Sequence, residues 1–108
     1  MANAYKVIGQ VADASAGNVP LVADQNGETI ISTIVVCNRE ASENTFKLAV
    51  RPGGATLANE HYISFDVPVP ANDTIFLTLG LTLADNDIIT CGASDANVSF
   101  SAFGTVIT

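Results

Sequence analysis

The stretch TIISTIVVCNREASENTFKLAVRP, residues Thr29 to Pro52, indicates the fold class of the whole chain. Its first apolar run, Ile30–Cys37, is almost entirely β-branched, as expected of a strand in the middle of a sheet. Its second run, Thr45–Arg51, alternates apolar and polar residues with the period of two that a half-exposed strand requires. A polar segment, Asn38–Asn44, separates the two runs. The pattern predicts a β-hairpin made of a central strand and a half-exposed partner.

Similar strand patterns recur along the chain, and turn residues separate them roughly every 8 to 12 residues. Pro20 marks one of these strands as an edge strand or an extended arm. We also expect one helical turn at Ala55–Glu60 and a tight turn at Asp24–Gly27. The expected strands are Tyr5–Ala12, Val19–Ala23, Ile30–Cys37, Thr45–Arg51, Tyr62–Val67, Asn72–Leu83, Ile88–Ala93 and Val98–Ile107.

These segments predict an all-β protein: a single-domain antiparallel β-sandwich of about eight short strands, jelly-roll or immunoglobulin-like. The domain is expected to span residues 1–108, with residues 1–4 as a flexible N-terminal arm. Gly9 is expected to mark a bulge or a close backbone approach. Phe100 and Phe103 fall on opposite faces of the last strand. That strand is therefore either covered on both sides or places one Phe against another subunit.

Composition excludes several classes of partner. The net charge is −7, and the four basic residues, Lys6, Arg39, Lys47 and Arg51, are too few for the basic footprint that nucleic acid binding needs. No apolar stretch is long enough to span a membrane, and no signal peptide is visible at the start. We therefore expect a protein that is made in a cytoplasm and stays there or is released by lysis.

The search for chemistry finds no catalytic, cofactor-binding or metal-binding motif. His61 is the one histidine, and we interpret it as a surface residue at a strand entrance because no nucleophile accompanies it. Asp85 and Asp87 lack the further oxygen ligands of a calcium loop and suit a hairpin turn. Cys37 and Cys91 lie in different expected strands. We expect two buried thiols more than a disulfide, although the geometry of facing strands leaves a bridge open.

Arg39 and Arg51 follow the two strands of the opening stretch, and we expect them at one corner of the molecule. With so few cations in the chain, each is expected to have an acidic partner. Two interpretations stay open. The pair forms intersubunit salt bridges that set register, or it forms exposed ion pairs that contribute little.

The chain resembles small structural proteins of tailed bacteriophages, especially those that infect cyanobacteria and other marine bacteria. The resemblance covers nearly the whole chain from Tyr5 onward. The similar sequence segments are Ser32–Arg39, Phe46–Pro52, His61–Ile63, Asp66–Pro68, Ala71–Thr74, Leu79–Leu83, Asp87, Asn97–Phe100 and Phe103–Gly104.

This resemblance implies a non-enzymatic virion protein present in many copies, foremost a capsid decoration or cement protein. Such a protein forms homo-oligomers, often trimers, binds the outside of the major capsid lattice and is assembled in the host cytoplasm. A β-domain of the neck, tail or fibre is the alternative, and a carbohydrate-binding receptor module is the third choice. The residues expected at a subunit interface are Tyr5, Arg39, Arg51 and Phe103.

Overall fold

The computed structural model describes residues 3–23 and 27–107. Two short 3-10 helices, η1 (Pro52–Gly54) and η2 (Asn59–His61), occupy the long connection in which one helical turn was expected. All the predicted strands are present, with bounds that agree within two residues. The strands in these ranges are β1 (Asn3–Val11), β2 (Val19–Val22), β3 (Glu28–Asn38), β4 (Asn44–Arg51), β5 (Tyr62–Val69), β6 (Thr74–Leu83), β7 (Ile88–Ala93) and β8 (Val98–Ile107).

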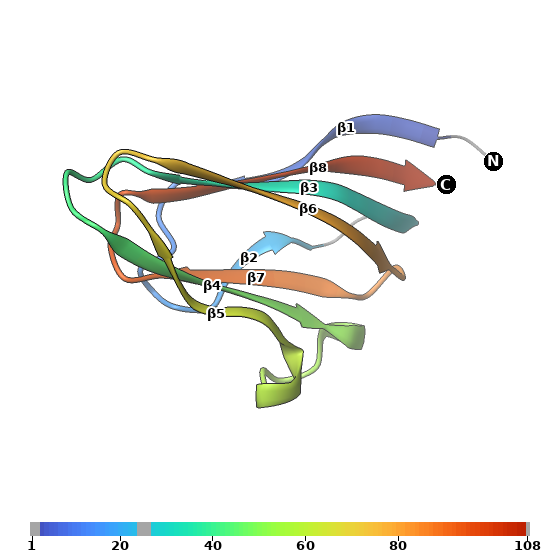
Figure 1. Cartoon of the computed structure of the whole chain (residues 1–108). Coiled ribbons are helices and arrows are strands. Elements are labelled where there is room, and N and C mark those ends of the chain that lie inside the picture. Colours follow the sequence, from blue (N-terminus) through green and yellow to red (C-terminus); the bar gives the residue numbers. More distant parts are fainter. Residues whose placement is uncertain (1–2, 24–26, 108) are drawn as a thin grey trace.

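The strands form two antiparallel four-stranded sheets that pack face to face (Figure 1). Sheet A has the order β1-β8-β3-β6, and sheet B has the order β2-β7-β4-β5. The pairs are nested: β1 with β8, β2 with β7, β3 with β6, and β4 with β5. A chain that folds back on itself in this nested way is a jelly roll, so the predicted sandwich is confirmed and is not immunoglobulin-like.

The hairpin predicted for the opening stretch is wrong. β3 and β4 are consecutive in sequence, but β3 lies in sheet A and β4 lies in sheet B. The segment between them therefore arches from one sheet to the other, as Figure 1 shows on the left. Both strands are central in their own sheets, because β3 has β8 and β6 as neighbours while β4 has β7 and β5. Two consecutive apolar faces can bury each other across a sandwich as well as side by side in one sheet.

The hydrophobic core lies between the two sheets. Inward positions alternate along each strand, as in β3, where Ile34 and Val36 are fully buried and Val35 is half-buried. The rings of Phe46 from sheet B and Phe100 from sheet A meet edge to face, with centroids 6.1 Å apart. Aromatic pairs prefer this geometry, which helps to hold the sheets together beyond simple burial of area.

The pairing register of sheet A shifts at neighbouring positions of its strands, close to Phe103. The register shifts between Val7 and Gly9 in the β1–β8 pair, and between Ile31 and Thr33 in both pairs of β3. A Cβ atom on Gly9 would lie 1.9 Å from the Leu21 carbonyl oxygen, so this position combines a bulge with a close approach of sheet B, as predicted. Bulges of this kind increase the local twist of a sheet.

Smaller predictions concern the N-terminal residues, one tight turn and β2, and they are confirmed only in part. Asn3 and Ala4 belong to β1 and are not a free arm, while residues 1–2 lie outside the described residues. The turn expected at Asp24–Gly27 also lies mostly outside them. β2, which contains Pro20, is an edge strand as predicted. No helix in the described ranges is long and apolar enough to cross a membrane.

Candidate functional site

The outer face of sheet A carries an apolar stripe, which we define as Tyr5, Val7, Phe103, Val35 and Phe76. Tyr5 and Val7 are alternate residues of β1, and Val7 is the direct cross-strand partner of Phe103 in β8. Val35 lies diagonally beside Phe103 and is the direct partner of Phe76 in β6. Cross-strand and diagonal neighbours on one face are in contact range, so the stripe runs unbroken across all four strands.

The ends of the apolar stripe are its most exposed parts. Tyr5 is 80% exposed and Phe76 is 68% exposed, while Val7 is 48% exposed. Scattered exposed apolar residues are normal, but an apolar band that crosses a whole sheet is characteristic of an interaction surface.

The rest of this face is also almost free of charge. The four strands of sheet A contain two charged residues, Glu28 and Lys6. Lys6 is the cross-strand partner of Gly104, and its side chain lies on the opposite face of β1 from Tyr5. Glu28 is the first residue of β3. The remaining outward positions of β3, β6 and β8 are mostly Thr, Ser and Ile, so the face is weakly polar and nearly neutral.

The four predicted interface residues do not lie together. Tyr5 and Phe103 share the apolar stripe, whereas Arg39 and Arg51 lie at opposite ends of the sandwich. Arg39 follows β3 and Arg51 ends β4, and because the chain reverses between these strands the expectation of a common corner is wrong. We name these two ends of the sandwich after Arg39 and Arg51.

Arg39 joins two loops of its own chain. Its Nη2 atom donates to the Ala12 carbonyl oxygen at 2.9 Å and to the Ala96 carbonyl oxygen at 3.4 Å. Nearby, hydrogen bonds from the Ser15 hydroxyl and main chain, together with the Arg39 charge, lower the pKa of Asp13 below its ordinary value. Arg39 thus acts through main-chain carbonyl groups, and its guanidinium forms no ion pair within the described residues.

Arg51 closes the connection that follows β4. Its Nε atom donates to the Ala55 carbonyl oxygen at 2.6 Å, and its Nη2 atom to the Gly54 carbonyl oxygen at 3.4 Å. Here too the acidic partner expected from the sequence is not found in the described part of the chain, where the ion pair is Lys47–Asp66. Carbonyl groups at a strand end need donors, and both arginines supply them.

A buried asparagine at the Arg39 end ties several loops together. Asn38 is 1% exposed, and its Nδ2 atom donates to the carbonyl oxygens of Ser42, Val69 and Pro70. Its Oδ1 atom accepts the Glu40 main-chain N–H and the Asn44 amide. From the sequence, Asn38 was expected only to be part of the polar segment between two strands. The signal available was its position as the polar residue that directly follows a buried strand.

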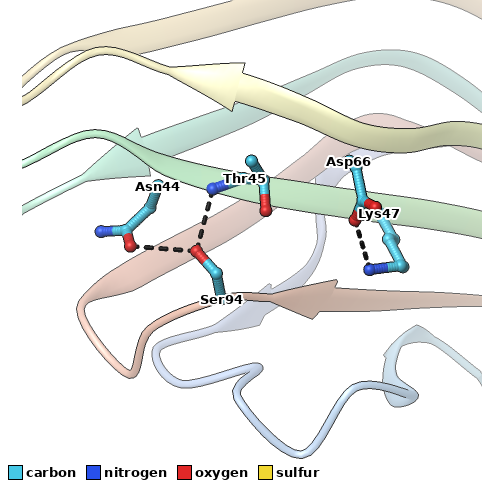
Figure 2. A network of polar contacts seen from close by, with 5 residues as sticks. All are labelled: Asn44, Thr45, Lys47, Asp66 and Ser94. Carbon is cyan, nitrogen blue, oxygen red and sulfur yellow. Dashed lines mark hydrogen bonds and ion pairs between the residues drawn. The ribbon is translucent and has the colours of Figure 1, made fainter.

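Figure 2 shows two groups of polar contacts along β4 of sheet B. The Ser94 hydroxyl accepts the Thr45 main-chain N–H and donates to the Asn44 side chain. Further along β4, Lys47 Nζ lies 2.5 Å from Asp66 Oδ1. Such an exposed pair contributes at most about 1 kcal/mol.

Phe65 adds an aromatic group to this ion pair. Lys47 Nζ lies 4.8 Å from the centroid of the Phe65 ring, and Tyr62 meets the same ring edge to face at 4.9 Å. Asp66 adopts a positive φ of 51°, which is uncommon for a residue other than Gly and reflects the irregular pairing of β5 with β4. Lys47, Phe65, Tyr62 and Asp66 thus contact one another within the same chain.

A pocket of about 430 Å³ lies at the Arg51 end, and its described lining is mostly apolar side chains and threonines, with Glu28 and Asp87 as the charged residues. The Asp87 carboxylate there accepts main-chain N–H groups from Gly53 and Ala84. The hydroxyl oxygen of Thr29 is buried and has no hydrogen-bond partner among the described residues. Within residues 3–23 and 27–107, no group of three or more His, Cys, Asp or Glu side chains could hold a metal ion.

His61 caps a local turn, since its Nδ1 atom accepts the Ala58 N–H at 3.0 Å.

The two cysteines are free. Cys91 is buried on the inner face of sheet B, where burial raises the pKa of its thiol to about 12. Cys37 is half-buried in β3, beside Ser99 and Thr74 in sheet A. The two thiols belong to different sheets, and Cys37 faces away from the core that holds Cys91. The prediction of free thiols is confirmed, but Cys37 is half-buried and not buried as expected.

Comparison with known proteins yields similarity of fold alone. No protein-family model matches the sequence, and comparison with curated proteins finds no match. A chain in the crystal structure of the IBDV viral particle matches 96% of this chain with 10% identity and a TM-score of 0.56. This chain spans 30% of the length of that one. At such low identity the likeness shows a shared β-sandwich and assigns no function.

Two other solved structures are less similar. A chain of the infectious bursal disease virus Gx strain matches 96% of this chain and 32% of its own length, with 13% identity and a TM-score of 0.46. A CBM22-1 xylan-binding domain from Paenibacillus barcinonensis matches 96% of this chain and 80% of its own length, with 14% identity and a TM-score of 0.37. These scores are too low to support a conclusion.

Proposed function

We propose that this protein is a non-enzymatic structural component of a tailed-bacteriophage virion. Its role is that of a capsid decoration or cement protein, which binds the outside of the major capsid lattice and stabilises it. The observation that carries the proposal is the nearly charge-free outer face of sheet A with its exposed apolar stripe. A surface of this kind supports assembly, and the described residues present no cluster that suggests catalysis.

Two further observations support the proposal. The jelly roll is a common architecture of viral capsid domains, although a fold alone does not determine a function. The solved chain with the same fold and a TM-score of 0.56 comes from a viral particle. The sequence resemblance to phage structural proteins is the basis for three further parts of the proposal: a tailed phage as the source, assembly in the host cytoplasm, and many copies per virion.

The protein is proposed to act as a homo-oligomer bound to the major capsid protein, with the trimer that the resemblance implies as the unit placed at threefold positions of the shell. Tyr5 and Phe103 are assigned to the contact surface because they lie in the apolar stripe. Arg39 and Arg51 stabilise loops at the two ends of the sandwich, and we assign them to the periphery of the contacts.

Copy number is the decisive measurement. Quantitative mass spectrometry of purified virions, with the major capsid protein as an internal reference, should give hundreds of copies per particle. A shell decoration has to match the many equivalent positions of an icosahedral lattice. A count of a few to some tens would contradict the capsid role and would support the alternative, a β-domain of the neck, tail or fibre.

A carbohydrate-binding receptor module is the third candidate, and one feature favours it. Phe65 is 59% exposed and lies beside Tyr62, Lys47 and Asp66, a combination of aromatic and polar groups that sugars can contact. The candidate ranks below the structural role because Lys47 and Tyr62 already contact the Phe65 ring. Specific binding of host polysaccharide that is lost in Phe65→Ala and kept in Phe76→Ala would favour this candidate.

A further inference from the structure

We infer that two copies of this chain pair face to face through the outer face of sheet A, related by a two-fold axis. The inference rests on the proposed structural role and names the occupant of the surface on which that role depends. The occupant is a second copy of the chain, and three properties of the face support this choice.

The first property is the distribution of charge. The chain carries a net charge of −7, so two copies repel each other wherever acidic residues face acidic residues. Acidic side chains occupy both ends of the sandwich, among them Asp13, Glu40 and Asp73 at the Arg39 end and Glu60 and Asp87 at the Arg51 end. The outer face of sheet A presents only Glu28, at its margin. Two copies can therefore approach through this face with little repulsion.

The second property is area. Four strands about 4.8 Å apart and about 3.3 Å per residue along the 11 residues of β3 give a face of roughly 650 Å² before side-chain relief is counted. A specific interface buries about 800 Å² on each partner. The face therefore falls in the lower part of the range of about 600–1,000 Å² per partner that specific interfaces bury.

The third property is the course of the apolar stripe. It runs diagonally from Tyr5 at one corner of the face, through Phe103 near the middle, to Phe76 at the opposite corner. A two-fold axis that lies in the plane of the interface and crosses the stripe at its middle lays one stripe over the other, so that Tyr5 of one copy faces Phe76 of the other in an isologous contact. Sheets that stack in this way interdigitate their side chains across about 10 Å.

This pairing is compatible with the trimer that the resemblance implies, because trimers built through other surfaces would pair into hexamers. In either case the number of copies in the complex is even. The residues that hold the pair together are the exposed ends of the stripe, Tyr5 and Phe76, since these lose the most contact with water.

The test is the mass of the purified full chain by multi-angle light scattering over a range of concentrations. We expect a dimer or a hexamer, and we expect Phe76→Asp to halve the mass. Tyr5→Asp, at the other end of the stripe, should do the same. The matched control is Phe65→Asp, which places the same charge at a similarly exposed Phe on sheet B and should leave the mass unchanged. Circular dichroism should show that each variant is folded.

Several outcomes would overturn the inference. A wild-type monomer or trimer at all concentrations would do so, as would an unchanged mass in both Phe76→Asp and Tyr5→Asp. If Phe76→Asp instead abolishes binding of a monomeric or trimeric protein to isolated shells, the stripe faces the capsid. In that case the pairing is wrong and the proposed function stands. Failure of the proposed function appears separately, as a low copy number in the virion.

Discussion

At the scale of single residues, polar groups in this protein act mainly at the strand ends. Asn38 ends β3 inside the protein and bonds to the loop that follows β3 and to the end of β5 with its following loop. Arg39 and Arg51 use their guanidinium groups on main-chain carbonyl oxygens. The loops of a jelly roll repeatedly cross from one sheet to the other. Their main-chain groups therefore depend on side-chain partners more than those of tight hairpins do.

Asn38→Ala is expected to reduce the free energy of unfolding by about 2–4 kcal/mol, because it leaves several buried main-chain groups without partners. Urea unfolding followed by circular dichroism measures the change. Ser42→Ala is the control, since Asn38 contacts only the main-chain carbonyl group of Ser42, and it should change stability little. Equal midpoints for Asn38→Ala and the wild type would show that the network adds nothing to stability.

The two thiols should differ in reactivity. In the folded protein at pH 8, a maleimide reagent is expected to modify Cys37 and to spare Cys91. Burial shields the Cys91 sulfur, and a pKa of about 12 keeps it protonated. Mass spectrometry after labelling should therefore find one adduct on the native protein and two on the protein unfolded in guanidinium chloride. Rapid double labelling of the native state would contradict this placement of Cys91.

At the scale of elements, some of the irregular positions of sheet A involve close backbone contacts, and others do not. Gly104 in β8 lies where three strands meet irregularly, and a Cβ atom there would lie 1.9 Å from the Ile30 carbonyl oxygen. The β6 bulge contains Gly80, where an added Cβ atom meets nothing within 4 Å. The same residue type thus has different roles on neighbouring strands of one sheet.

Gly104→Ala should destabilise the protein by about 2–4 kcal/mol, because the β3 backbone has to move to make room. Gly80→Ala should be neutral or stabilising by about 0.5 kcal/mol, since it restricts the unfolded chain without a clash. Thermal unfolding of both variants beside the wild type measures the contrast. If the two substitutions lower the melting temperature equally, the close contact at Gly104 is not the cause.

At the scale of the whole molecule, acidic ends and a neutral sheet face lead to opposite expectations for two modes of assembly. Association through the apolar stripe should strengthen as salt rises, because salt screens the repulsion between chains of net charge −7. Association through ion pairs of Arg39 and Arg51 should weaken under the same change. The apparent dissociation constant in about 0.05 M and about 0.5 M sodium chloride, from sedimentation equilibrium, distinguishes them. A weaker complex at high salt would favour the arginines.

Much of the local structure could be predicted. The strand positions, the edge strand with Pro20 and the bulge at Gly9 follow from alternation and from the special backbones of Pro and Gly. The candidate site was predicted in part. Tyr5 and Phe103 lie in the apolar stripe, but Val35 and Phe76 were not singled out, because a pattern along one strand does not show which residues of other strands lie beside it.

The amino-acid sequence by itself determined that this chain forms short, two-faced strands around one apolar core and carries most of its acidic residues in the turns, because these properties depend on neighbours in sequence. The tertiary structure alone decided that the two strands of Thr29–Pro52 belong to different sheets. It also decided that outward-facing apolar residues of four strands form one stripe. Strand pairing and register are set by how all eight strands bury their apolar faces together, and no single segment contains that information.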